Sequence, residues 1–272
     1  MKIFKTRSDL QKIRDKKEKI AFIPTMGALH AGHVSMIKKA KKNKQKTLIS
    51  IFINPKQFNS NKDYTNYPKN IMKDRKILKN IKIDYLFLPS VKQIYSFKTK
   101  NKIFLDVFEK RLCGRYRPGH FKGVVNVVIR FLEIIKPDTI YLGEKDFQQL
   151  YLIKKHINKS KIKTKIVPCK TIRNKCGLAL SSRIFRLTTK EITIACKIVK
   201  IIKDRKKQII KNRLKNFNFK DEKNKINSFK FSKVEYIEAI NLNNLKKINN
   251  YVKNFKIFIS FYINKVRLID NI

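Results

Sequence analysis

Short apolar runs alternate with helical stretches along roughly the first 170 residues, and this alternation restricts the possible folds more than any other feature of the sequence. Apolar runs typical of strands lie at residues 20–24, 48–53, 85–88, 139–142 and 165–167, with helical patterns between them at 34–40, 71–80, 124–135 and 146–156. Such alternation predicts an α/β fold, with a parallel sheet, right-handed crossovers and helices on both faces. Because ligands in these sheets bind beyond the carboxyl ends of the strands, we expect the site in the loops after Pro24, Ile53 and Leu142.

The pattern changes near Thr188. A helix is predicted over residues 191–210, residues 211–228 are polar and weakly patterned, and two β-branched and aromatic runs at 234–242 and 255–262 predict strands. Two strands without a clear helix between them indicate a small antiparallel sheet. We therefore predict two domains: residues 1–183 with the parallel sheet, and residues 184–272 as a small α+β domain.

Charge is the feature of the composition that first suggests a function. The chain has 66 Lys and Arg against 19 Asp and Glu, a formal net charge of +47, which is typical of nucleic-acid-binding proteins. However, the cations are mostly Lys and are spread along the whole chain. Lys, Asn, Ile and Phe are abundant together while Gly, Pro and Trp are scarce, as A+T-rich codons would produce. We therefore predict no specific nucleic-acid partner, although a basic nucleic-acid-binding protein remains the alternative from another functional class.

Neither a membrane span nor a signal peptide is predicted. A bilayer span needs about 20 mostly apolar residues, and the most apolar window, residues 124–135, is shorter and carries polar residues. The first residues lack the apolar core of a signal peptide, so we predict a cytoplasmic protein. Cys113, Cys169, Cys176 and Cys196 form no Cys-x-x-Cys pair, and in such a compartment we expect free thiols.

The motif richest in chemistry is Pro-Thr-Met-Gly-Ala-Leu-His-Ala-Gly-His at residues 24–33. A strand enters a glycine-containing loop and then a helix, which directs backbone N–H groups and the positive end of the helix dipole toward an anion. His30 and His33 lie on one side of the first helical turn, where imidazole N–H groups can stabilise charge on a phosphate. A structural turn with two surface histidines is the alternative interpretation. The motif resembles the HIGH signature of class I aminoacyl-tRNA synthetases and nucleotidylyltransferases.

Four further motifs carry polar or charged side chains in loops. Asn54 to Phe58 offers amides for a small polar ligand, or simply ends a strand. Arg117 to Gly123 is typical of an anion site. Gly143 to Leu150 is another strand–glycine–helix junction in which Lys145 can meet a phosphate and Asp146 can cap the helix. Gly177 to Arg183 is either a loop that closes over a triphosphate or a polar linker.

Taken together, these motifs resemble the pantothenate synthetase (pantoate–β-alanine ligase) family, over nearly the whole chain. The resemblance implies a Rossmann-like nucleotide-binding domain with a small C-terminal domain, and a homodimer. It implies an ATP-dependent ligase whose partners are pantoate, β-alanine and ATP with Mg²⁺, and which forms pantothenate, AMP and pyrophosphate through a pantoyl adenylate. Another HIGH-type nucleotidyltransferase is the alternative enzyme.

The resemblance also assigns roles to residues of this chain. His30, His33 and Lys145 would be catalytic, Gln57 and Gln149 would bind pantoate, and Gln57 would also bind β-alanine. The ATP site would comprise Met26, Gly27, Ala28, Leu29, His30, Ala31, Gly32, His33, Gly143, Glu144, Lys145, Asp146, Ile172, Leu180, Ser181, Ser182 and Arg183. Asp74 would bind the metal, and Asn54, Arg117 and His120 are secondary candidates. The chain departs from the family pattern at Lys56, Lys73, Cys176 and Ile184.

Overall fold

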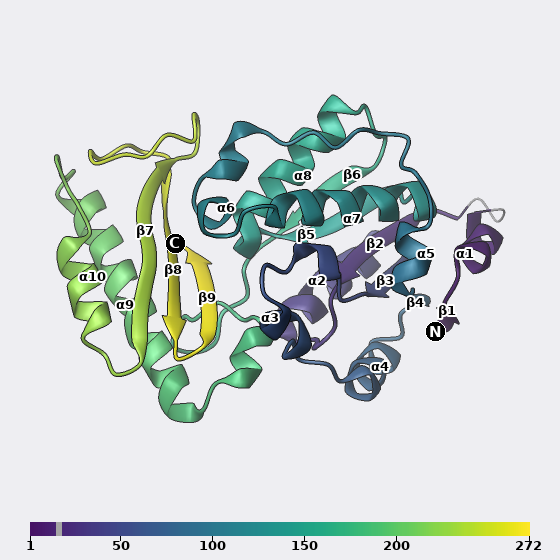
Figure 1. The fold of residues 1–272 in the computed structure, drawn as a ribbon, viewed down its shortest axis with the longest axis horizontal. Coiled ribbons are helices and arrows are strands. Elements are labelled where there is room, and N and C mark those ends of the chain that lie inside the picture. Colours follow the sequence, from purple (N-terminus) through teal and green to yellow (C-terminus); the bar gives the residue numbers. More distant parts are fainter. Residues whose placement is uncertain (15–17) are drawn as a thin grey trace. The chain divides into compact units, whose positions relative to one another are not determined.

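The computed structural model describes residues 1–14 and 18–272, which form two compact units, Met1–Ile172 and Arg173–Ile272 (Figure 1). The compact units divide after Ile172, whereas the predicted domain boundary lies at residue 183. That domain boundary remains a prediction. Within the described part of the chain, no helix is long and apolar enough to cross a membrane.

The described residues of the first unit contain a six-stranded parallel sheet with the strand order β1-β4-β3-β2-β5-β6. The strands are β1 (Lys2–Phe4), β2 (Ile20–Thr25), β3 (Lys46–Ile51), β4 (Tyr85–Phe87), β5 (Thr139–Gly143) and β6 (Lys165–Cys169). The helices are α1 (Arg7–Arg14), α2 (Ala31–Lys42), α3 (Asn61–Thr65), α4 (Ile71–Asn80), α5 (Val91–Tyr95), α6 (Cys113–Tyr116), α7 (His120–Ile135) and α8 (Phe147–Lys159). Three short 3₁₀ turns are η1 (Pro55–Gln57), η2 (Val107–Lys110) and η3 (Glu144–Asp146).

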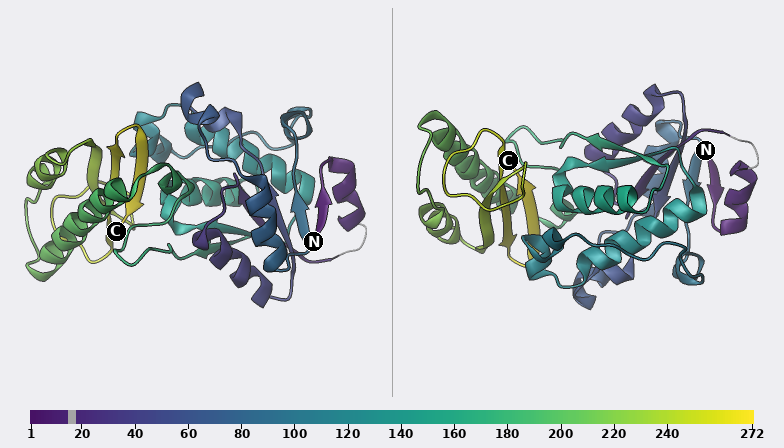
Figure 2. Two further views of the ribbon diagram at one scale, coloured as in Figure 1. Left: turned by 90° about the horizontal axis from the view of Figure 1, so that it is seen from below. Right: turned by 90° about the horizontal axis from the view of Figure 1, so that it is seen from above.

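Helices cover both faces of this sheet, as the sequence predicts. Ala21 and Ile23 of β2 pack in one apolar cluster with Ile37 of α2 and Leu78 of α4. Phe22 lies between them in sequence, so its side chain points to the other face, where its ring centroid is 5.3 Å from that of Phe131 of α7. Figure 2 shows α2 and α4 on one side of the sheet and α7 on the other.

The order of the strands creates a topological switch point beside β2. The chain leaves β2 toward β3 and β4 on one side, and later returns to place β5 on the other side of β2. The carboxyl ends of β3, β2 and β5 are therefore neighbours at one edge of the sheet. Ligands of open α/β sheets bind at such a point, and the three loops expected to form the site all begin there.

The second unit contains a separate three-stranded antiparallel sheet among its described residues, formed by β7 (Ser232–Asn241), β8 (Phe255–Ile263) and β9 (Val266–Asn271). The 3₁₀ turn η4 (Ser182–Arg186) and the helices α9 (Thr189–Lys211) and α10 (Lys220–Asn227) precede it. Apolar residues of both helices pack with the sheet in one core cluster. This confirms the small antiparallel sheet. The helix α10 lies within residues 211–228, where the sequence has only a weak pattern. The pattern is weak because Ile226 is the one buried residue of this helix.

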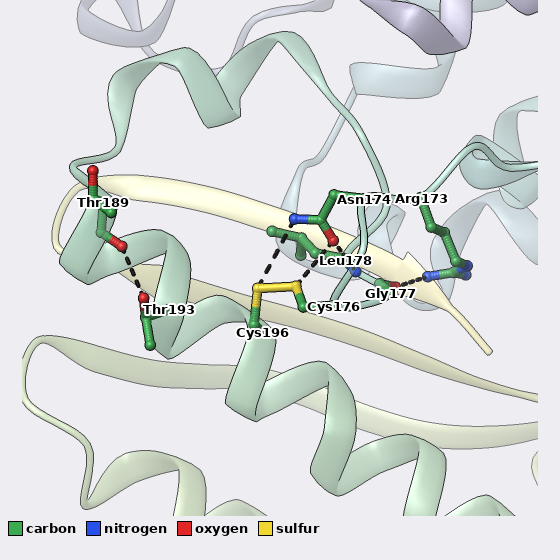
Figure 3. Close-up of a disulfide and its surroundings, with 8 residues drawn as sticks. All are labelled: Arg173, Asn174, Cys176, Gly177, Leu178, Thr189, Thr193 and Cys196. Carbon is green, nitrogen blue, oxygen red and sulfur yellow. Dashed lines mark hydrogen bonds between the residues drawn. A yellow bond between two sulfur atoms is a disulfide. The ribbon is translucent and has the colours of Figure 1, made fainter.

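Two of the four cysteines contradict the expectation of free thiols. Cys176 and Cys196 form a disulfide, with their Cα atoms 5.7 Å apart (Figure 3). The reason is tertiary: Cys176 lies in the loop before η4, and that loop runs beside α9, which carries Cys196. The two cysteines are 20 residues apart in the sequence, so a local pattern such as Cys-x-x-Cys could not predict their contact. Cys113 and Cys169 are buried and form no disulfide, as expected for thiols packed as small apolar groups.

Alkylation counts the disulfide directly. We expect the unfolded, unreduced protein to take up two equivalents of iodoacetamide, on Cys113 and Cys169, and four after reduction. Mass spectrometry of the two samples measures the difference. Closing a loop of this size stabilises a fold by about 3 kcal/mol, so reduction should also lower the melting temperature. Four equivalents without reductant would contradict the disulfide.

Candidate active site

The loop between β2 and α2 is held in shape by a buried carboxylate of α4. The side chain of Asp74, 2% exposed, accepts hydrogen bonds from the backbone N–H groups of Ala28 (2.9 Å) and Leu29 (2.8 Å). Gly27 has a φ of +80°, and a Cβ on it would lie 3.0 Å from Asp74 Oδ2. The loop therefore depends on a glycine that can adopt the left-handed region and on the acidic side chain below it.

This bonding bears on the metal role predicted for Asp74. Both of its carboxylate oxygens are engaged by the backbone of the loop, and the group is buried. Within the described residues, no group of three or more His, Cys, Asp or Glu side chains could hold a metal ion. The observed contacts of Asp74 are structural, and its metal role stays a prediction.

The two histidines of the loop cap the start of α2. His30 is the N-cap residue, and its Nδ1 accepts a hydrogen bond from the backbone N–H of Gly32 (3.1 Å). His33 is residue N3, and its Nδ1 accepts one from the backbone N–H of His30 (3.3 Å). This reciprocal arrangement is a capping box in which imidazoles replace the usual hydroxyl and carboxylate. The imidazole ring centroids are 4.1 Å apart, so both rings lie together on one side of the helix start.

These hydrogen bonds fix which nitrogen of each ring carries the proton. A backbone N–H can only donate, so Nδ1 of both rings must accept. In the neutral imidazole the proton then lies on Nε2. His30 and His33 therefore each keep an Nε2–H donor that the capping box does not use. Two such donors beside the N-terminus of a helix suit an incoming phosphate.

Both imidazoles are neutral at physiological pH. Burial is the main cause, and it lowers the pKa of His30 from 6.5 to about 4, with a further lowering by the charge of Lys145. For His33, burial and then His30 lower the pKa to about 3, while the carboxylate of Asp146 acts in the opposite direction. The site thus presents N–H donors without two extra positive charges.

NMR titration tests this protonation state. We expect the Cε1–H signals of His30 and His33, assigned from His30→Gln and His33→Gln variants, to stay constant from pH 8 to about 5. The unfolded chain binds protons near the ordinary pKa of 6.5, so the folded state loses stability as the pH falls from there toward about 4. A midpoint near 6.5 for either signal would show that the rings are solvated and charged.

Lys145 lies in the turn η3 after β5, beside the two histidines. Its Nζ is 3.2 Å from Oδ1 of Asp146, and its side chain is 17% exposed. Its charge lowers the pKa of both His30 and His33, which places it in the same site. Asp146 stands at the N-cap of α8 but makes no capping hydrogen bond with its side chain, so its observed role is the ion pair. Gly143 ends β5, and a Cβ built on it would meet no described atom within 4 Å.

Gln57 reaches the same loop from the turn η1, which follows the neighbouring strand β3. Its Nε2 is 3.0 Å from the Sδ of Met26 in the β2–α2 loop. Its Oε1 accepts a hydrogen bond of 3.1 Å from Asn54 Nδ2, and Asn54 Oδ1 in turn accepts one of 2.7 Å from the hydroxyl of Tyr95. The side chain of Gln57 is therefore oriented by a short chain of hydrogen bonds. Tyr95 lies in no motif of the sequence, so its part in this chain of hydrogen bonds could not be predicted.

The two glutamines in the first turn of α8 have different surroundings. Gln148 is buried, and its Nε2 donates to the backbone carbonyls of Phe108 (2.7 Å) and Arg111 (2.7 Å), which holds η2. Gln149 is half-buried and is the next residue along the helix, about 100° further around it. Of these two glutamines, Gln149 is the one predicted to bind pantoate together with Gln57, and its role stays a prediction.

The remaining ATP-site candidates are divided between the two units. Ile172 is the last residue of the first unit, whereas Leu180, Ser181, Ser182 and Arg183 belong to the second. Their contacts with ATP stay predictions. Two departures from the family pattern have structural explanations: Ile184 packs against the core of the second unit, and the Nζ of Lys56 lies 4.2 Å from the centroid of the Tyr95 ring.

Arg117 and His120 were expected to form an anion site. Polar atoms of both side chains contact the backbone of the turn η1, and their role at an anion site stays a prediction. His120 Nδ1 and Arg117 Nη2 lie 2.6 Å and 3.1 Å from the carbonyl oxygen of Gln57. The sequence motif shows cations and a histidine close together. It does not show that Arg117 and His120 contact a backbone carbonyl.

Comparisons with known proteins agree along the whole chain. The family model for pantoate-beta-alanine ligase matches residues 2–272. A pantothenate synthetase of Francisella philomiragia is 45% identical over 258 residues, which cover 94% of this chain and 90% of the relative. A crystal structure of the pantoate-beta-alanine ligase of Francisella tularensis, complexed with beta-gamma ATP and beta-alanine, has a TM-score of 0.84 at 43% identity and covers 100% of this chain and 97% of that one. The enzyme of Thermus thermophilus has a TM-score of 0.91 at 27% identity, with 100% and 99% covered.

Proposed function

The chain belongs to the pantoate–β-alanine ligase family, and on that premise we propose that it joins pantoate to β-alanine at the expense of ATP. In the first step a carboxylate oxygen of pantoate attacks the α-phosphorus of ATP. The bond to the β-phosphate breaks, and pyrophosphate leaves. In the second step the amine of β-alanine attacks the acyl carbon of the pantoyl adenylate. The C–N bond of pantothenate forms, AMP leaves, and the amine releases a proton.

The observation that carries this proposal is the group of donors at the switch point of the sheet. His30 and His33 offer two Nε2–H groups at the N-terminus of α2, and Lys145 adds one positive charge from the end of β5. In the first step negative charge builds on the oxygens of the α-phosphate. Fixed donors aimed at that charge stabilise a transition state more than the ground state.

Pantoate must lie between these donors and the side chains that orient it. We assign Gln57 and Gln149 to pantoate, since neutral amides can both donate to a carboxylate and accept from hydroxyl groups. Gln57 also serves the β-alanine step in this proposal. Held by Asn54, it keeps its Nε2 toward the loop that contains Met26. Such positioning of two reactants supplies much of the rate in reactions of this kind.

Mg²⁺ is proposed as the companion ion of ATP. The described residues offer no preformed cluster for a metal ion. Mg²⁺ usually keeps several waters and binds through substrate phosphates with only one or two carboxylates. The residues present therefore fit an ion held mainly by the triphosphate, where it would neutralise phosphate charge.

We also propose that the protein works as a homodimer in the cytoplasm, as its family resemblance implies. Light scattering on a sizing column measures the mass of the assembly. The disulfide bears on the compartment, because disulfides are rare where thiols are kept reduced. Alkylation of the protein in intact cells before lysis reports which state it has there.

A mass-spectrometric assay tests the proposed function. Incubation with pantoate, ATP and β-alanine should give pantothenate, AMP and pyrophosphate in equal amounts, and omission of any one substrate should abolish pantothenate. Formation of a dinucleotide, or release of AMP at a rate independent of β-alanine, would instead indicate another HIGH-type nucleotidyltransferase. Activity should persist with competitor DNA at physiological salt, and its loss would favour a nucleic-acid-binding role.

A further inference from the structure

The backbone carbonyl of Gln57 is held by two side chains from the start of α7. His120 Nδ1 lies 2.6 Å and Arg117 Nη2 lies 3.1 Å from this oxygen. His120 is only 8% exposed, so its hydrogen bond is shielded from water. A carbonyl oxygen has two lone pairs and can accept both hydrogen bonds. The two hydrogen bonds therefore fix the orientation of the peptide group that joins Gln57 to the next residue.

The arginine also determines the protonation of the histidine. Arg117 Nη1 lies 3.0 Å from His120 Nε2, and a guanidinium can only donate. Nε2 must therefore accept, which places the imidazole proton on Nδ1. That nitrogen is the one facing the carbonyl of Gln57, so His120 donates to it. The three groups form a closed triangle in which each of the three hydrogen bonds joins a donor to an acceptor.

The turn η1 also packs directly against the backbone of α7, at Gly123. A Cβ on Gly123 would lie 2.0 Å from the carbonyl oxygen of Lys56, so only glycine allows this approach. The carbonyl of Gly123 accepts a hydrogen bond of 3.2 Å from Asn54 Nδ2. The turn is thus fixed at both ends, by Asn54 at its start and by Gln57 at its end.

We propose that Arg117 and His120 are positioning residues for the binding of pantoate, and that they act through the backbone of Gln57. This proposal rests on the proposed function, in which Gln57 contacts pantoate. Without the two donors the turn loses the bonds that fix its last peptide, and the amide of Gln57 no longer points to one place. The consequence falls on pantoate and not on ATP, which lies against the β2–α2 loop.

Asn and Gln substitutions at His120 separate the two hydrogen bonds of the imidazole. The amide nitrogen of Asn can occupy the place of Nδ1, so His120→Asn keeps a donor for the carbonyl of Gln57. His120→Gln places its amide near the position of Nε2 and loses that donor. Loss of one buried hydrogen bond typically has about a tenfold effect. We therefore expect His120→Gln to raise the pantoate KM about tenfold with an unchanged ATP KM, and His120→Asn to stay close to the wild type.

Arg117 has a matched control two residues away in the same segment. Arg117→Lys cannot reach the carbonyl and the imidazole together and should raise the pantoate KM, with the ATP KM unchanged. Arg115 is exposed beside the ring of Tyr116, and Arg115→Lys should leave both constants unchanged. Melting temperatures of all variants identify general loss of folding, which would alter both KM values together.

A double-mutant cycle shows whether the effect passes through Gln57. In a Gln57→Ala background, His120→Gln should add nothing to the pantoate KM. Equal effects on both KM values, or full additivity with Gln57→Ala, would overturn the proposal. An active wild type with an unchanged pantoate KM in His120→Gln overturns it alone, whereas a wild type that forms no pantothenate overturns the proposed function.

Discussion

Replacing Lys145 by Gln is expected to lower kcat/KM for ATP by about 10²–10³-fold, the usual effect of removing one group that stabilises charge in a transition state. Its ammonium is largely buried beside His30 and His33, so solvent screens its charge little. Gln keeps the length of the side chain and a polar end but lacks the charge. Steady-state rates at varied ATP concentrations and several salt concentrations measure the loss.

The control for Lys145 is a group of exposed lysines that carry the same charge. Replacing Lys211, Lys215, Lys220 and Lys223 together by Gln should leave kcat/KM nearly unchanged. Surface substitutions of this kind usually alter stability by no more than about 0.5 kcal/mol each. A large loss in this fourfold variant, growing as the salt concentration falls, would show that the charge of +47 attracts the substrate and is not merely a product of codon bias.

Replacing His33 by Ala is expected to slow adenylate formation by about 10²–10³-fold, because the Nε2–H donor to the α-phosphate is lost. Rapid-quench measurement with pantoate and ATP, without β-alanine, isolates this first step. The second step, with preformed pantoyl adenylate and β-alanine, should change much less. In that step the amine attacks the acyl carbon, and the α-phosphorus is not attacked.

Two further variants at this position separate catalysis from helix capping. His33→Asn keeps an acceptor for the backbone N–H of His30 but has no donor at the place of Nε2, so it should be as slow as His33→Ala. His33→Gln is long enough to supply both groups and should recover part of the rate. A rate close to that of the wild type for His33→Asn would mean that His33 only caps α2.

The arrangement of the sheet follows from local patterns, and so it could be predicted from the sequence. The apolar runs and the helical spacing fix the parallel sheet, and its loops bring His30, His33 and Lys145 to one edge. These predictions succeed because each depends on residues close together in the chain. The observed strand order adds one piece of information to these predictions, namely which of the loops are neighbours.

The contacts that could not be predicted join distant parts of the chain. The carboxylate of Asp74 supports a loop 45 residues away in sequence, and no local motif marks this contact. Arg117 and His120 contact the carbonyl of a residue that is 60 and 63 positions away in the sequence, and a sequence does not show whether a guanidinium binds a substrate or the backbone. Cys176 and Cys196 likewise become neighbours only through the packing of α9.

Transfer of oxygen-18 from pantoate tests the central claim, attack of the pantoate carboxylate on the α-phosphate, most directly. With pantoate labelled in both carboxylate oxygens, the adenylate mechanism predicts that one label appears in AMP and one remains in the amide of pantothenate. Mass spectrometry of the products after a single turnover measures both. Label in inorganic phosphate together with ADP, or AMP without label, would contradict the account.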